Sequence, residues 1–193
     1  MQQQQILQNI AKHIQLDEQE ASHFLSLLQH KKFARKEILL QEGQACKSIY
    51  YVCSGALRAY YADKQGSSNI IMFAIADWWI TDIYSFINRQ PAMLYIDALM
   101  ETEVLELNIN DLEQLYIAVP KFERFFRIIM QNSYIREQLR SIQNISLPAE
   151  ERYLNFVKKY PSFVRLIPQK QIASYLGITP QFLSVIRKKL ASS

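Results

Sequence analysis

The chain has 193 residues, of which 49% are hydrophobic and 21% are charged, with a formal net charge of +4. This composition is typical of a soluble globular protein with one large domain or two small ones. Four glycines are too few to favour a glycine-rich nucleotide loop. No apolar run approaches the roughly 18 residues of a membrane span, and the Gln-rich N-terminus lacks a secretory core, so we expect a cytoplasmic protein that contacts no membrane.

Cysteines and histidines indicate no metal chemistry. The two cysteines, Cys46 and Cys53, are too few for a disulfide framework. His13, His23 and His30 lie in or near the N-terminal helical pattern, and we interpret them as surface or packing residues. Since no Cys or His stands at metal-ligand spacing, we expect neither a metal site nor a cofactor.

Residues 6–28 have a helical pattern, and Asp17 and Glu20 have the spacing of a capping box. Between Phe33 and Leu107 the pattern changes to short β runs that are separated by Gly-containing and polar turns. Strands at this spacing predict an antiparallel sandwich or barrel.

A helical period returns after the strands. Asn110 and Glu113 have the spacing of a second capping box, and Pro120 suits the first turn of a further helix. Residues 121–145 contain no Gly or Pro, and one stripe recurs at three- and four-residue steps: Phe125, Ile128, Asn132, Ile135, Leu139 and Ile142. This stripe is compatible with packing on the β domain and with a two-fold dimer helix, and the pattern alone does not separate the two.

The stretch SLPAE, residues 146–150, predicts a boundary between a domain of residues 1–145 and a domain of residues 146–193. Residues 146–193 contain eight basic and two acidic side chains, a net charge of +6 that leaves −2 for the rest of the chain. A basic C-terminal part on a mildly acidic body favours a polyanionic partner for that part alone.

The stretch QKQIASYLGITPQFLSVIRKKL, residues 169–190, predicts a helix-turn-helix. Ala173 is small where two helices would cross, and Gly177 permits positive φ at the turn. Thr179 is the expected N-cap of the second helix, with Pro180 in its first turn. Apolar residues occur at the spacing of a shared core: Ile172, Leu176, Ile178, Leu183 and Ile186.

The second helix of this motif is the expected recognition helix in the major groove of DNA. We predict base contacts from Thr179, Gln181, Ser184 and Lys188. We predict phosphate contacts from Arg165, Lys170, Arg187 and Lys189.

A β-rich domain, a long helix and this motif, in that order, resemble the Crp–Fnr family of bacterial transcription regulators over nearly the whole chain. The stretch EGQACKSIYYVCSGALRAYY is similar to the opening strands of a cyclic-nucleotide-binding jelly roll. The resemblance implies an α+β fold with N-terminal helices, an antiparallel jelly roll, a long dimer helix and a C-terminal helix-turn-helix. It also implies a homodimer on palindromic double-stranded DNA, with RNA polymerase as a further partner.

The family holds a cyclic nucleotide with a segment containing Gly-Glu, followed by Arg and Ser or Thr. Here Thr81 and Asp82 stand at the first place and Ala92, Met93 and Leu94 at the second, so a buried phosphate lacks its cation. We therefore expect no control by cAMP. The segment is aromatic and apolar, and we expect it either to bind an apolar effector or to be filled by its own side chains. Its residues are Trp79, Thr81, Asp82, Tyr84, Met93 and Tyr95.

Two further features of the family are missing from the sequence. Its oxygen sensors use a cysteine cluster near the N-terminus, and no cysteine precedes Cys46. Its recognition helix is commonly followed by a short β wing, where this sequence has Ala191, Ser192 and Ser193. We therefore expect no role in oxygen sensing and fewer phosphate contacts than the family pattern implies.

The leading hypothesis is a dimeric DNA-binding regulator with an unidentified small-molecule effector or none. The alternative is a ligand-binding signalling module that acts through protein contacts and carries a vestigial DNA head. No constellation of acids, histidines or nucleophiles favours an enzyme.

Overall fold

The computed structural model describes residues 2–191, and its N-terminal part is helical as predicted. The helical stretch is broken into α1 (Gln2–Ala11) and α2 (Glu18–Ser26). The Asp17 side chain accepts from the Glu20 amide, and the Glu20 carboxylate accepts from the Asp17 amide, both at 2.9 Å. This reciprocal pair is the predicted capping box, and it fixes where α2 begins.

The middle of the chain is an antiparallel sandwich, as the spacing of the β runs predicts. Residues 2–191 contain two four-stranded sheets, with strand orders β1-β8-β3-β6 and β2-β7-β4-β5. The first sheet consists of β1 (Leu28–Phe33), β8 (Thr102–Asn108), β3 (Ser48–Ser54) and β6 (Trp79–Ile80). The second consists of β2 (Ile38–Leu40), β7 (Tyr95–Ala98), β4 (Ala56–Ala62) and β5 (Ser68–Ile75). The short helix α3 (Ile83–Asn88) lies between β6 and β7 in sequence.

The main core lies between the two sheets and continues under the helices. Side chains from both sheets, such as Tyr51 and Ile96, are fully buried there. The first turns of α5 (Lys121–Ser146) close the core with Phe122, Phe125 and Phe126. Because strands and helices bury apolar area in one continuous cluster, α1, α4 (Ile109–Ala118) and the first part of α5 are fixed to the sandwich.

The start of α4 differs from the predicted one. Its N-cap is Asn108, whose side chain accepts from the amide of Asn110. The Asn110–Glu113 box is therefore wrong, because the helix begins two residues earlier and Asn110 already lies inside it. The prediction for α5 is confirmed, because a helix of 26 residues runs from Lys121 to Ser146 with Pro120 at its N-cap.

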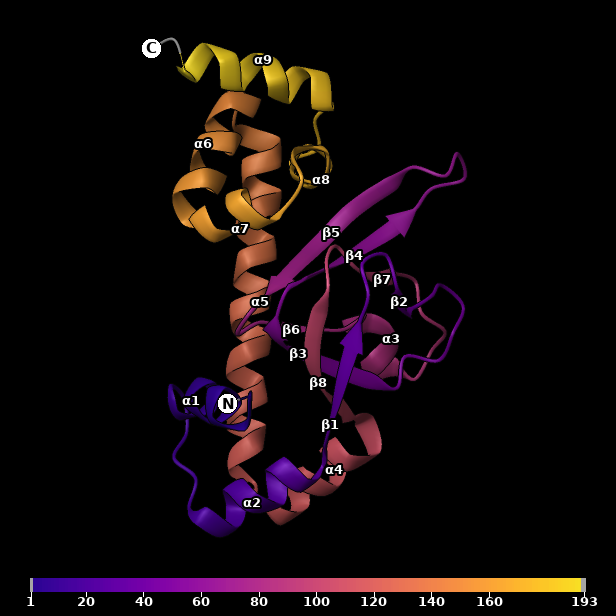
Figure 1. Ribbon diagram of the computed structural model, residues 1–193, viewed down its shortest axis with the longest axis vertical. Coiled ribbons are helices and arrows are strands. Elements are labelled where there is room, and N and C mark those ends of the chain that lie inside the picture. The colour runs from indigo at the N-terminus through magenta and orange to yellow at the C-terminus, as the bar shows by residue number, and fades with distance from the viewer. Residues whose placement is uncertain (1, 192–193) are drawn as a thin grey trace.

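Helix α5 forms the long axis of the molecule (Figure 1). At one end of it lie α1, α2 and α4, and at the other lie the C-terminal helices. These are α6 (Ala149–Lys159), α7 (Pro161–Leu166), α8 (Gln169–Tyr175) and α9 (Pro180–Ala191), and we call them the head. The head has a second core, which it shares with Ile70 and Phe73 of β5.

Candidate nucleic-acid interface

The turn between α8 and α9 has the geometry that the sequence predicts. Gly177 has φ +65°. Its amide donates to the Ser174 carbonyl at 3.1 Å, and the Ile178 amide donates to the Ala173 carbonyl at 3.0 Å. These two bonds form a Schellman motif, which ends α8 sharply and requires the left-handed conformation that glycine adopts without strain.

The two helices share one buried core. The predicted apolar residues Ile172, Leu176, Leu183 and Ile186 are buried, Ile178 is partly buried, and Ala173 is fully buried in the same cluster. The Thr179 hydroxyl accepts from the amide of Phe182 at 3.1 Å, so it caps α9 as predicted. Helices α8 and α9 therefore form the predicted helix-turn-helix.

The outer face of α9 is exposed and lies at one end of the molecule (Figure 1). Gln181, Ser184 and Lys188 are exposed and, at steps of three and four residues, lie on one side of the helix. Thr179 is exposed too, but its hydroxyl already serves as the cap. The structure thus brings the predicted base-contact residues together on a single face.

The four predicted phosphate-contact residues are exposed but differ in their surroundings. Arg165 lies in the last turn of α7, Lys170 lies in the first turn of α8, and Arg187 lies on α9. Lys189 forms an ion pair with Glu150 of α6, with 2.7 Å between Nζ and Oε2. Because both partners are partly exposed, this pair contributes little stability and opens readily.

Sequence reasoning missed that the head is fixed to the sandwich by polar contacts. The Ser174 hydroxyl accepts from the Ile70 amide at 3.1 Å and donates to the Ser68 carbonyl at 2.8 Å, so α8 satisfies the free edge of β5. Arg58 of β4, in a two-pronged ion pair with Asp97, also donates to the Gln171 amide oxygen at 2.8 Å. No short motif signals these contacts, because they join residues more than a hundred positions apart.

The stripe on α5 divides into two parts. Phe125 is fully buried in the chain's own core, where its ring lies 5.9 Å from that of Trp79, so it is not available to a partner. Ile128 is half-buried, and beyond it Asn132, Ile135, Leu139 and Ile142 are exposed. The first part therefore packs on the sandwich and the second part presents an apolar face to solvent.

Asp82 organises the predicted effector segment. Its buried carboxylate accepts from the amides of Met93 at 2.7 Å and Leu94 at 3.0 Å through Oδ2, and from the amide of Ser85 at 3.3 Å through Oδ1. These amides belong to the start of α3 and to the loop after it, where the family pattern places the phosphate of a nucleotide. The chain's own anion therefore occupies these donors.

The other five residues of this set do not converge on one cavity. Trp79 is buried against Phe126, with 5.3 Å between ring centroids. The Thr81 hydroxyl donates to the Ser48 carbonyl at 2.9 Å. Tyr84 and Met93 are about half exposed, and Tyr95 stacks on Tyr60.

An open, largely apolar groove of about 610 Å³ lies beside α5, and of the predicted effector residues only Trp79 and Thr81 line it. Its walls include Ile83 and Ile87 of α3 and Met130 and Tyr134 of α5. The groove borders the exposed part of the α5 stripe, so apolar surface continues from the helix onto the sandwich.

Both cysteines are buried and unpaired by a disulfide. Burial raises the pKa of the Cys53 thiol to about 11 and also raises that of Cys46. Thiols with raised pKa values are poor nucleophiles and poor metal ligands at neutral pH. Among the residues that the structure describes, no three His, Cys, Asp or Glu side chains form a metal-binding group.

Comparison with known proteins agrees with these observations. Residues 30–118 match the family described as "Cyclic nucleotide-binding domain". Electron transport regulator A of Shewanella oneidensis is 25% identical over 183 residues, which cover 88% of this chain and 72% of that protein. The Anaerobic regulatory protein of Haemophilus influenzae is 25% identical over 88% of this chain and 70% of its own length. The structure of FixK2 from Bradyrhizobium japonicum superposes with a TM-score of 0.75 at 18% identity, over 86% of this chain and 85% of that one.

A jelly roll of the cyclic-nucleotide-binding type, joined through a long helix to a helix-turn-helix, defines a class of two-part regulators. In this arrangement and in its sequence, the chain is similar to regulators of the Crp–Fnr family. The relatives it matches are named as regulators rather than enzymes. Within residues 2–191, no helix is both long enough and apolar enough to cross a membrane. The predicted lack of a wing concerns the end of the sequence, where residues 192–193 lie outside the described part.

Proposed function

We propose that the chain is a DNA-binding transcription regulator that reads palindromic sites as a homodimer. The observation that carries the proposal is the exposed polar face of α9, held in place by a Schellman turn and a shared core with α8. A rigid helix that presents polar side chains outward at the end of a molecule fits the major groove.

The α9 face divides into base-reading and phosphate-contacting positions. Gln181 carries an amide that pairs with an adenine edge, and Ser184 and Lys188 follow it along the same face. Arg187 lies at the side of α9, and Arg165 and Lys170 lie on the neighbouring helices. These three cations, with Lys189 once its pair with Glu150 opens, contact phosphates and set the register.

The part of the α5 stripe from Ile128 onward is the proposed dimer seam. Ile128, Asn132, Ile135, Leu139 and Ile142 follow one another at steps of 4, 3, 4 and 3 residues, which is the heptad spacing of a two-stranded coiled coil. Asn132 falls on a core position of the type that fixes register in such pairs. Two copies joined along this seam carry two heads related by a two-fold axis, which matches a palindromic DNA site.

Control by cAMP does not fit the effector segment. The phosphate donors of the family pattern are bonded to Asp82, and Ala92 and Met93 stand where the pattern has its cation and hydroxyl. A nucleotide phosphate would have to displace a buried carboxylate that already has three charge-assisted bonds. The proposed regulator therefore responds to a different effector or acts without one, and RNA polymerase is its proposed downstream partner.

Selection of genomic DNA fragments by the purified protein at physiological salt tests the proposal. The account predicts enrichment of a two-fold symmetric sequence by the wild type and its loss in Arg187→Ala, Lys188→Ala. Arg35→Ala, Lys47→Ala removes the same charge from exposed positions on the β domain and should enrich the same sequence. Failure of the wild type to enrich any sequence, with and without cell extract, favours the alternative of a signalling module with a vestigial DNA head.

A further inference from the structure

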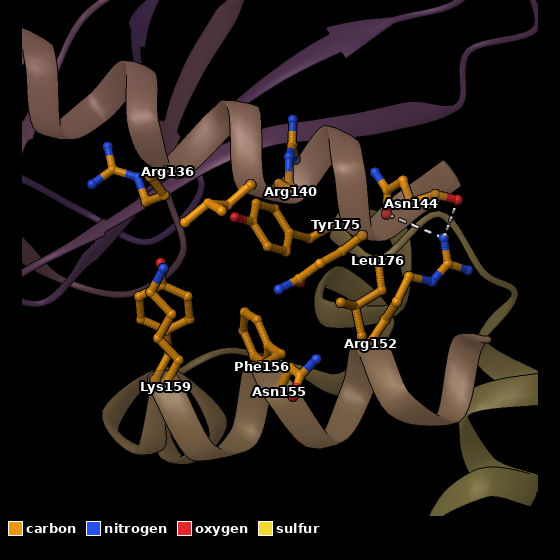
Figure 2. A pocket seen from close by; sticks show the side chains of 12 residues that line it. Arg136, Arg140, Asn144, Arg152, Asn155, Phe156, Lys159, Tyr175 and Leu176 are labelled. Carbon is orange, nitrogen blue, oxygen red and sulfur yellow. Dashed lines mark hydrogen bonds between the residues drawn. The ribbon is translucent and has the colours of Figure 1, made fainter. Parts of the chain in front are cut away.

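A basic cavity of about 60 Å³ lies where α5, α6 and α8 meet (Figure 2). Helix α5 contributes Arg136 and Arg140 to its lining, and α6 contributes Arg152 and Lys159. Tyr175 of α8 lies between the two helices. This cavity is far in sequence from the Asp82 segment and is separate from the exposed face of α9.

The positive charge of the four lining cations is larger than the negative charge around the cavity. No acidic residue of the described chain is part of the lining. Outside the lining, Glu137 pairs with Arg140 at 2.9 Å. Arg140 and Arg136 lie over the rings of Tyr175 and Trp78, each 4.6 Å from the ring centroid, so aromatic faces help to position their guanidinium groups. Like charges around one cavity repel one another, and an anion bound there would relieve that repulsion.

Arg152 also has an unused donor. Its Nη1 donates to the side-chain and backbone oxygens of Asn144 at 3.1 and 3.4 Å, which fixes the guanidinium. Its Nε is buried and bonds to no protein atom. A buried N–H of a charged group without a partner is costly, and such a group indicates a missing acceptor.

The size and chemistry of the cavity define the ligand. A small cavity of about 60 Å³ with a basic lining suits one tetrahedral oxyanion better than a nucleoside. Guanidinium groups bind phosphate oxygens through paired, charge-assisted hydrogen bonds. We propose that this cavity is a phosphate-binding site, occupied by inorganic phosphate or by the phosphate of a small monoester whose organic part extends through the open side.

A phosphate in this cavity would add a second link between α5 and α6, beside the bonds from Arg152 to Asn144. Arg136 and Arg140 belong to the helix that carries the dimer stripe, whereas Arg152 and Lys159 belong to the head. A shared anion therefore fixes the angle at which the head leaves α5. Any effect of that angle on DNA affinity rests on the proposed function, but the binding of phosphate does not.

The test is a calorimetric titration of the full chain with inorganic phosphate, without DNA and at constant ionic strength. The cavity variant is Arg140→Gln, Arg152→Gln. The control is Arg127→Gln, Lys158→Gln, which removes the same charge from the same two helices outside this cavity. We expect one saturable site per chain in the wild type. The dissociation constant should be at least about tenfold higher in the cavity variant, because charge-assisted bonds are lost. The control variant should bind phosphate nearly as the wild type does.

Phenyl phosphate, titrated in parallel, distinguishes the two sources of the anion. Tighter binding than inorganic phosphate identifies a monoester site with an aromatic wall, and weaker binding identifies a site for the free ion. Because Arg140 also contacts the Ile70 carbonyl, unfolding of the double variant is checked by circular dichroism. Arg152→Lys then serves as the second variant, since it keeps the charge, removes Nε and should still weaken binding. No saturable binding of either probe, or equal weakening in the cavity and control variants, would overturn the proposal.

Discussion

The effector segment of the sandwich and the recognition face of the head differ in the partners of their polar groups. In the effector segment, Asp82 is buried, and all recorded bonds of its carboxylate go to backbone amides of its own chain. On α9, the side chains of Gln181 and Ser184 are exposed to water. Groups that are already bonded within the chain resist a ligand, whereas solvated groups on a rigid helix exchange water for a partner at little cost. This difference supports the proposal that recognition takes place on the head.

The largest expected effect concerns the part of α5 that the sandwich leaves uncovered. Ile135→Asp places two carboxylates in the proposed dimer seam, and burying them should raise the dimer dissociation constant about a thousandfold, or about 4 kcal/mol. Analytical ultracentrifugation measures the change. Ser141→Asp, at an exposed position of the same helix outside the stripe, is the matched control and should stay dimeric. A dimeric Ile135→Asp protein would exclude the seam.

The second expected effect concerns the closed effector segment. Asp82→Ala leaves the amides of Met93 and Leu94 without their charged acceptor, and we expect unfolding free energy to fall by about 3 kcal/mol in urea titrations. Asp63→Ala also removes an acceptor of two amides, those of Gln65 and Ser67, but in an exposed turn where water replaces it. That control should lose about 1 kcal/mol or less. Equal losses would mean that burial of Asp82 has no special role.

The third effect concerns base reading by α9. Gln181→Ala should lower the preference for the matched base by about 2 kcal/mol while binding of unrelated duplexes stays the same. Competition between duplexes that differ at single positions measures this preference. An unaltered base preference would show that Gln181 does not read bases, and Ser184 and Lys188 would then be the remaining candidates for base reading.

The smallest effect concerns the phosphate contacts. Arg165→Ala, Arg187→Ala should weaken binding to every duplex alike, by about tenfold at physiological salt, and lower the salt slope by about 2 because two counterions fewer are released. Titrations at several salt concentrations give the slope. A slope that matches that of the wild type would show that these side chains do not reach phosphates.

Local features of this structure could be predicted from sequence. The helix-turn-helix depends on residues within about two helical turns of one another, since Gly177 sets the turn, Thr179 caps α9 and the apolar spacing fills the shared core. The cap of α4 was misplaced because Asn108 and Asn110 both precede a helical pattern, and only the strand register decides between them.

Long-range pairings could not be predicted in the same way. Apolar periodicity along α5 does not say which side chains meet the sandwich, so Phe125 was grouped with the exposed stripe. The bonds from Ser174 to β5 and the approach of Arg152 to the α5 arginines depend on how separate elements pack. No spacing rule relates residues on different elements, and the basic cavity is therefore visible only in the structure.

We infer that recognition belongs to the head and that Asp82 closes the effector segment of its own chain. The most direct measurement is the affinity of the purified protein for its selected palindromic duplex, in titrations with and without saturating cAMP. The account predicts tight binding that cAMP leaves unchanged. Binding that appears only with cAMP would contradict it, because the nucleotide would then have displaced Asp82 from the amides that the structure assigns to it.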